Sequence, residues 1–143
     1  MSISDLFDSG FKERNQGHFA SIVRVAIEDG DISHEEKAFL DKLAKRLEIS
    51  DQDYKEILAN PFKYPINPPH LYVQRLERLY DLSYMVYADH ILGPKQKEIL
   101  GRFALALGFT PGNVKYIVDK ALSLLVLNVD SETFVYEMQH MNK

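Results

Sequence analysis

The sequence predicts an all-α fold: one bundle of six to eight helices, built from two three-helix repeats related by a pseudo-twofold axis. Apolar residues recur at spacings of three and four, as one face of a helix requires. No stretch shows the strict alternation of a half-buried strand. The chain has 143 residues, of which 45% are apolar and 27% charged, so we expect a single domain that folds unaided.

A short helix is expected near residues 3–9, and seven longer ones follow. They are predicted at about residues 18–28, 34–47, 51–59, 68–88, 94–107, 111–127 and 131–141. Polar residues precede several of these segments, and their side-chain oxygens can accept backbone N–H groups that a first helical turn leaves unpaired. These start signals are Ser33 with Glu36, Ser50 with Asp53, Asn67 with Pro68, Thr110 with Pro111, and Asp130 or Ser131.

Two apolar stretches in the second half allow two interpretations each. Tyrosines at helical spacing are expected to belong to the core with their hydroxyls at its rim, or else to line a ligand pocket. The final helix is expected to dock onto its own bundle, or else to present a face to a partner. The tyrosines are Tyr72, Tyr80, Tyr84 and Tyr87. The apolar residues of the final helix are Phe134, Val135, Met138 and Met141.

A proline-rich connector at residues 60–69, NPFKYPINPP, separates two related halves. Phe62, Tyr64 and Ile66 are expected to hold this connector onto the core. The repeats span about residues 18–59 and 70–127, with the C-terminal helix at 131–141 beyond them. Asp29, Lys37, Leu40, Ala44, Leu47, Lys55 and Ile57 recur 60 positions later as Asp89, Lys97, Leu100, Ala104, Leu107, Lys115 and Ile117.

Neither repeat can bury an apolar face alone, so we expect the two to pack against each other. One end of the repeat differs between the copies. Gly108 stands where a left-handed residue commonly ends a helix, whereas the first copy has Glu48. Because a non-glycine residue in that conformation costs about 1 kcal/mol, the first copy is expected to end its helix differently.

The most informative segment is an acidic turn at residues 28–36, EDGDISHEE, with five carboxylates and no Lys or Arg. Gly30 permits a tight reversal between two helices. The segment Asp29-Gly30-x-Ile32-x-x-x-Glu36 matches the end of an EF-hand loop, but the two earlier ligands would be Val25 and Ile27. Apolar side chains cannot bind calcium, so an EF-hand is excluded.

Two interpretations of the acidic turn remain. In the first, Ser33 and Glu36 form a capping box, Ile32 enters the core, and the acids favour the positive end of the next helix. In the second, the carboxylates hold a hard divalent cation, Ca²⁺ or Mg²⁺, with water completing its coordination. The ligands in this second interpretation are Asp29, Asp31 and either Glu36 or Glu35.

This pattern resembles the tellurite-resistance TerB family. A helix, the Asp29 to Glu36 turn and an amphipathic helix are duplicated after a spacer, and the resemblance covers about residues 18–125. The second half adds residues 77–82, ERLYDL, then Met85, Ala88-Asp89 and residues 106–109, ALGF. The resemblance implies a small all-helical bacterial protein associated with tellurite resistance and other stress responses. It also implies a metal-binding site at Asp29, Asp31 and Glu36, with a partner element at Asp89.

The second copy departs from the family pattern. His90 replaces the glycine, Gln96 replaces the terminal glutamate, and Lys95 lies beside it. A cation that loses a carboxylate and gains a nearby ammonium group binds more weakly. Two equivalent sites are therefore not expected. Our hypothesis is that Asp89 faces the first turn and completes one mixed site, which requires its carboxylate to lie within about 10 Å of that of Asp29.

Other functional classes are excluded or disfavoured. The five histidines show no HExxH pairing, and no phosphate-binding loop or nucleophile motif is present, so we expect no enzyme. A net charge of −4 without a basic aromatic array argues against nucleic-acid binding. No apolar run approaches the ~20 residues that span a membrane. With no cysteine and no signal-like start, the cytoplasm is the expected compartment. The expected partners are a divalent cation and an unidentified protein, and a homodimer is one option.

Overall fold

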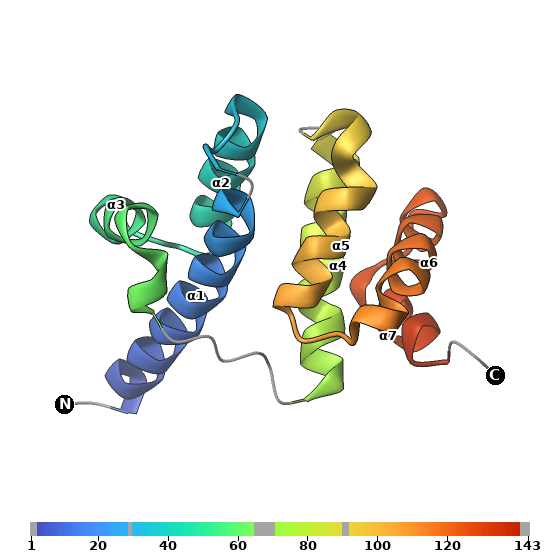
Figure 1. Ribbon diagram of the computed structural model, residues 1–143. Coiled ribbons are helices and arrows are strands. Elements are labelled where there is room, and N and C mark those ends of the chain that lie inside the picture. The colour runs from blue at the N-terminus through green and yellow to red at the C-terminus, as the bar shows by residue number, and fades with distance from the viewer. Residues whose placement is uncertain (1–2, 29, 65–70, 90–91, 141–143) are drawn as a thin grey trace. The chain divides into compact units, whose positions relative to one another are not determined.

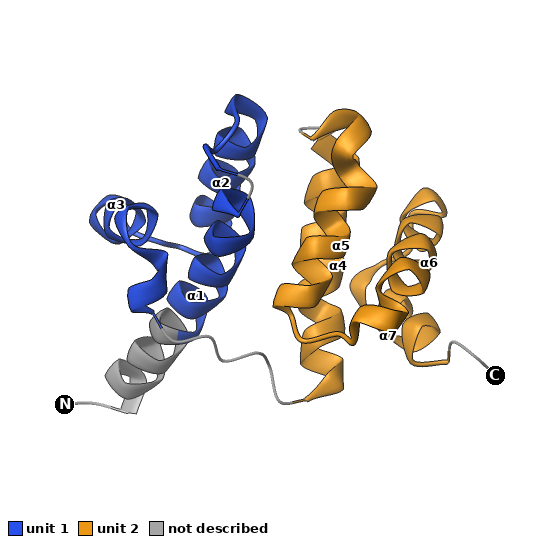
Figure 2. Cartoon of the chain, in the orientation of Figure 1, with its two compact units in different colours: residues 1–67 blue, residues 68–143 orange. Residues whose placement is uncertain are grey.

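The computed structural model describes residues 3–28, 30–64, 71–89 and 92–140, with side chains from Arg14 onward. Over these residues every regular element is a helix, which confirms the all-α prediction (Figure 1). The chain divides into two compact units, residues 1–67 and 68–143, with the boundary inside the proline-rich segment (Figure 2). None of the described helices is long and apolar enough to cross a membrane.

Unit 1 contains α1 (Ile3–Ile27), α2 (His34–Arg46), α3 (Asp51–Ala59) and a short 3₁₀ turn, η1 (Pro61–Lys63). The continuous helix α1 replaces the two helices predicted at 3–9 and 18–28, so that predicted break is wrong. The segment between them contains no proline, and residues such as Lys12 and Glu13 favour a helix even where the apolar pattern is weak.

The core of unit 1 lies where α1 contacts both α2 and α3. Each helix contributes apolar side chains at spacings of three and four, and burial of these side chains from water holds the unit together. The buried set includes Phe19, Ile22, Val23 and Ala26 from α1, Phe39, Leu40 and Leu43 from α2, and Ile57 from α3.

The proline-rich connector is held onto α1 by Arg24. Its guanidinium donates to the backbone oxygens of Pro61 and Tyr64 and lies 4.9 Å from the centre of the Phe62 ring. Pro61 is buried, whereas Phe62 is 67% exposed. The prediction that Phe62 anchors the connector in the core is therefore wrong, because the ring covers the Arg24 side chain instead. Ile66 lies outside the described residues.

Unit 2 contains α4 (Tyr72–Asp89), α5 (Gln96–Ala106), α6 (Val114–Val126) and α7 (Ser131–Gln139), with 3₁₀ turns η2 (Gly93–Lys95) and η3 (Pro111–Asn113). Helix α4 contacts α5, α6 and α7. The buried core includes Leu76, Leu79, Leu82, Val86, Leu100, Phe103, Ile117, Ala121, Phe134 and Met138.

Helix α7 docks onto its own unit, as predicted. Phe134 and Met138 are 0% and 1% exposed, because this side of the helix faces α4 and α6. Met141 lies outside the described residues. The prediction of a tyrosine core along α4 is confirmed for Tyr80, which is half-buried and donates its hydroxyl to the oxygen of Val129 at 3.3 Å. Tyr84 is 44% exposed, so the tyrosines do not share one environment.

The ends of α2 and α5 are alike. Glu48 and Gly108 follow these helices with φ of 59° and 101°, both in the left-handed region. The next amide donates to the oxygen five residues earlier in both cases, at 2.9 Å in unit 1 and 3.1 Å in unit 2. The prediction that the first copy ends its helix differently is therefore wrong. The paired hydrogen bonds hold Glu48 in a conformation that glycine adopts more easily.

Candidate functional site

The acidic turn connects α1 to α2. Gly30 has φ of 112° and donates its N–H to the oxygen of Ile27 at 3.0 Å, which confirms the expected tight reversal. Asp31 follows this reversal with an exposed side chain, and Ile32 is half-buried. Asp29, the first predicted ligand, lies outside the described residues. The part of the turn that is described leads directly into the start of α2.

A complete capping box begins α2. The Ser33 hydroxyl accepts the N–H of Glu36 at 3.1 Å, and the Glu36 carboxylate accepts the N–H of Ser33 at 3.0 Å. These two hydrogen bonds satisfy backbone groups that the first helical turn leaves unpaired. The capping interpretation is thus confirmed for Ser33 and Glu36, and it engages one carboxylate oxygen of a predicted metal ligand.

The other predicted ligands lie at the surface. Asp31 and Glu35 are exposed at the start of α2, and Asp89 is exposed at the end of α4. Within the described ranges, no three His, Asp or Glu side chains are grouped so that they could hold a metal ion. Because Asp29 is outside those ranges, the site of Asp29, Asp31, Glu35 or Glu36, and its pairing with Asp89, stays a prediction.

The second turn uses its polar residue in the opposite way. Gln96, at the position equivalent to Glu36, donates its amide N–H to the backbone oxygen of Val86 at 2.7 Å. The bond ties the first residue of α5 to the last turn of α4, where carbonyl groups lack helical partners. From the sequence, Gln96 was expected only to weaken a metal site by replacing a carboxylate. The useful signal was the amide itself, since it can donate a hydrogen bond and a carboxylate cannot.

The pKa shifts of unit 1 concentrate at the contact between α2 and α3. The Tyr54 hydroxyl donates to Asp41, whose carboxylate also pairs with Lys37 at 2.9 Å. The hydrogen bond from Tyr54 lowers the pKa of Asp41, and burial raises the pKa of Tyr54. Hydrogen bonds to Tyr54 and Asp41 raise the pKa of Lys37. These shifts favour the charged forms of Lys37 and Asp41 and the protonated form of Tyr54. Those forms maintain the hydrogen-bonded contact between α2 and α3.

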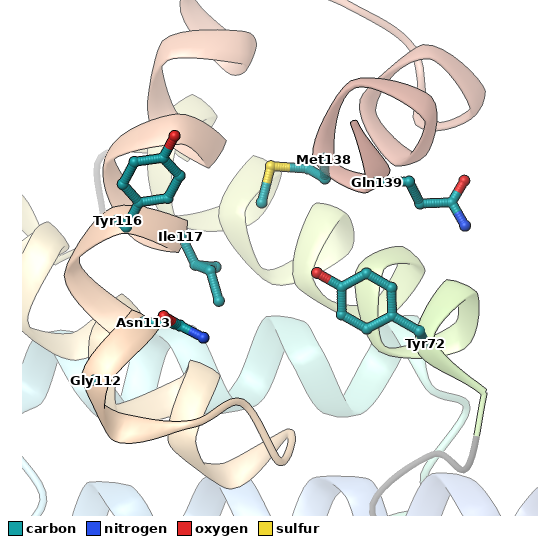
Figure 3. Close-up of a pocket in the computed structure, with 7 residues that line it drawn as sticks. All are labelled: Tyr72, Gly112, Asn113, Tyr116, Ile117, Met138 and Gln139. Atoms are coloured by element: carbon teal, nitrogen blue, oxygen red, sulfur yellow. The ribbon is translucent and has the colours of Figure 1, made fainter. Parts of the chain in front are cut away.

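Unit 2 contains a pocket of about 290 Å³ that sequence reasoning did not locate (Figure 3). It lies where the first turn of α4, the start of α6 and the end of α7 meet. The tyrosine pattern could have suggested it only through Tyr72, because the other walls come from segments far apart in the sequence. Its lining residues are Tyr72, Gly112, Asn113, Tyr116, Ile117, Met138 and Gln139.

The resemblance to the TerB family rests on the sequence pattern between about residues 18 and 125. No family model, no curated protein and no solved structure matches this chain.

Proposed function

We propose that this chain is a non-catalytic, TerB-like helical protein that acts by binding another protein, and that its first acidic turn needs no metal ion. The observation that carries the proposal is the capping box of Ser33 and Glu36. Such a cap contributes about 1 kcal/mol, and acidic side chains add favourable interactions with the positive helix terminus. The acids of this turn therefore have a structural use without a cation. The resemblance would associate the protein with bacterial stress or tellurite resistance in the cytoplasm.

Exposed apolar side chains support a role in protein contacts. Among the described residues, every large apolar side chain with high exposure lies in unit 2, apart from Phe62. Exposed apolar side chains are available for contact with a second copy of the chain or with a different protein. The exposed residues are Leu71, Tyr72, Val73, Tyr84, Leu105, Tyr116, Val126, Leu127 and Tyr136.

We further propose that residues 18–59 and 70–127 are diverged copies of one three-helix repeat. The support comes from buried positions 60 residues apart and from the matching ends of α2 and α5. Such agreement is expected when one apolar pattern is used twice. The buried pairs include Phe19 and Leu79, Ile22 and Leu82, Ala26 and Val86, Leu40 and Leu100, Leu43 and Phe103, and Ile57 and Ile117.

A divalent-cation site at the first turn is the second candidate function. The reversal at Gly30 leaves Asp31 and Glu35 exposed close to the capped start of α2. Carboxylate oxygens are the ligands that Ca²⁺ and Mg²⁺ prefer, and the capping box uses only one of the two oxygens of Glu36. With Asp29 added, this turn would carry the acids that the TerB-like resemblance assigns to metal binding.

Thermal unfolding with and without divalent cations separates the two candidates. We expect the same unfolding temperature for the wild type in Ca²⁺, Mg²⁺, Mn²⁺ and chelator. An ion present at tenfold its dissociation constant would instead add about 1.4 kcal/mol. The test variant is Asp29→Asn with Asp31→Asn, and the control is Glu77→Gln with Glu98→Gln, which makes the same charge change on exposed residues of unit 2. If ions raise the unfolding temperature of the wild type and of the control, but not of the Asp29→Asn, Asp31→Asn variant, the cation site replaces the metal-independent proposal.

A further inference from the structure

We propose that the pocket at the start of α6 binds a small, uncharged aromatic compound of one or two rings that carries a hydrogen-bonding group. The proposal does not depend on the role of the acidic turn. All seven lining residues belong to unit 2, so the pocket is complete within one compact unit.

The pocket has an apolar floor that the core holds in place. Ile117 and Met138 are 4% and 1% exposed, so their side chains are held by packing on most sides. In Figure 3 the Met138 thioether and the Tyr72 hydroxyl point toward Ile117 across the pocket. A thioether and a flat apolar surface both make favourable contacts with aromatic rings.

Two tyrosines provide aromatic walls. Tyr72 and Tyr116 are 45% and 52% exposed, so each still has ring surface available for a ligand. The Tyr72 ring meets Phe109 edge-on, with the ring centres 6.0 Å apart, which restricts its orientation. A ring that is already oriented loses little conformational freedom on binding.

The polar groups of the pocket favour a neutral ligand. They are the amides of Asn113 and Gln139 and the two phenol hydroxyls, and none of the seven lining residues carries a charge. A charged compound would lose hydration here without meeting an opposite charge. In Figure 3 the side-chain amide of Gln139 points away from the other labelled residues, so Tyr72 and Asn113 are the expected hydrogen-bonding partners.

The size of the pocket limits the ligand. A volume of about 290 Å³ lies just below the usual range for ligand pockets, which is roughly 300–1,000 Å³. One or two fused rings fit this volume. Phenols and indoles combine that size with a neutral hydrogen-bonding group.

Unit 1 does not provide the same chemistry at the equivalent positions. Sixty residues before Asn113 and Tyr116 the chain has Asp53 and Glu56, and the Asp53 carboxylate accepts a hydrogen bond from Gln16 at 2.9 Å. Unit 1 also has no described counterpart of α7, the helix that supplies Met138. The neutral side chains of Asn113 and Tyr116 are therefore not repeated at the equivalent positions of unit 1.

Ligand-detected ¹⁹F NMR on the full chain tests the proposal with defined probes. We expect saturable binding of 4-fluorophenol and 5-fluoroindole at neutral pH, and about tenfold weaker binding of 4-fluorobenzoate, which has the same fluorinated ring but carries a charged carboxylate in place of the hydroxyl. In ¹H–¹⁵N spectra of the ¹⁵N-labelled chain, the backbone amide signals of Gly112, Asn113 and Gln139 should shift when the neutral probes are added. No saturable binding, shifts confined to other residues, or equal binding of the benzoate would overturn the proposal.

A matched pair of variants locates the binding site. Tyr72→Leu removes a pocket wall, whereas Tyr84→Leu removes a tyrosine of nearly equal exposure, 45% against 44%, that does not line the pocket. We expect roughly tenfold weaker probe binding in Tyr72→Leu, the effect of about one aromatic contact, and wild-type binding in Tyr84→Leu. Equal affinities in the two variants would overturn the proposal.

Gly112→Leu tests the site without removing any contact of the fold. Gly112 lines the pocket, and a Cβ atom added there meets nothing within 4 Å, so a larger side chain begins in open space at this wall. We expect this variant to unfold at the wild-type temperature and to lose probe binding. Full probe binding in folded Gly112→Leu would contradict the assigned site, even if Tyr72→Leu proved too unstable to study.

Discussion

The two inter-helix turns of this chain, between α1 and α2 and between α4 and α5, place a polar side chain at the same position and use it in opposite ways. Glu36 accepts the N–H of Ser33 and so begins its own helix. Gln96 donates to the oxygen of Val86 and so ties its helix to the end of the preceding one. The difference teaches that repeated geometry does not imply repeated chemistry, because each turn satisfies a different set of unpaired backbone groups.

The largest expected effect comes from exchanging these two side chains. Gln96→Glu replaces a donor with a carboxylate that faces a carbonyl oxygen, and we expect it to lower the free energy of unfolding by about 2 kcal/mol. Glu36→Gln should cost only about 0.5 kcal/mol, because an amide oxygen can still accept the Ser33 N–H. Urea unfolding followed by circular dichroism measures both variants.

Glu98→Gln is the control for the exchange, since it changes an exposed acid in the first turn of α5. It should leave stability unchanged. Equal losses in Gln96→Glu and Glu36→Gln would show that the two turns do not differ as the hydrogen bonds indicate.

Removal of helix caps should produce the next largest effect. Ser33→Ala removes a side-chain cap and should cost about 1 kcal/mol in urea unfolding. Thr110 precedes η3 without any side-chain capping bond, so Thr110→Ala should change stability little. An equal loss of stability in the two variants would contradict this prediction, because it would show that the capping hydrogen bond of Ser33 adds no stability.

Substitutions at the C-terminal ends of α2 and α5 should change the stability less, and in opposite directions. Glu48→Gly relieves a left-handed non-glycine residue, and we expect a gain of about 0.5–1 kcal/mol. Gly108→Ala introduces that strain into unit 2 and should lose a similar amount. Thermal unfolding of the two variants checks the sign. A loss in Glu48→Gly would show that the Glu48 side chain stabilises the fold in a way that its exposure does not suggest.

The smallest expected effect is a pH dependence of the free energy of unfolding. It should come from the contact between α2 and α3 in unit 1, where Tyr54 donates to Asp41. Because the Tyr54 hydrogen bond lowers the pKa of Asp41 in the folded chain, its stabilisation is present above about pH 4 and is lost as the pH falls through the folded pKa. The stability difference between wild type and Tyr54→Phe should therefore shrink in acid. Urea unfolding at a series of pH values measures it.

Tyr116→Phe is the matching control, because it removes an exposed tyrosine hydroxyl in unit 2. Its stability relative to wild type should not vary across the same pH range. A constant difference for Tyr54→Phe would contradict the assigned role of its hydrogen bond.

Much of the fold was predictable because the relevant interactions are local. Ser33, Ser50 and Asp130 each accept the N–H of a residue three positions later, and such a cap is visible in a short stretch of sequence. Glu48 shows the limit of local reasoning. Its unfavourable conformation is maintained by hydrogen bonds at the helix end, so residue preference alone predicted the wrong ending.

The parts that were not predictable depend on residues far apart in the chain. Phe62 lies on the surface because Arg24, 38 positions earlier, lies against its ring. The unit 2 pocket needs Tyr72 together with Met138, which come from different helices. The acidic cluster was recognised from composition, but composition does not say whether a carboxylate will accept a backbone N–H or bind a cation.

A titration of Ca²⁺ and then Mg²⁺ into the ¹⁵N-labelled chain tests the central claim most directly, with the amides of Ser33 and Glu36 as reporters. If the first acidic turn only caps α2, the chemical shifts of these two amides in millimolar ion will equal those measured in the presence of a chelator. A saturable shift of both signals, lost in Asp31→Asn but kept in Glu98→Gln, would contradict the account and identify the turn as a cation site.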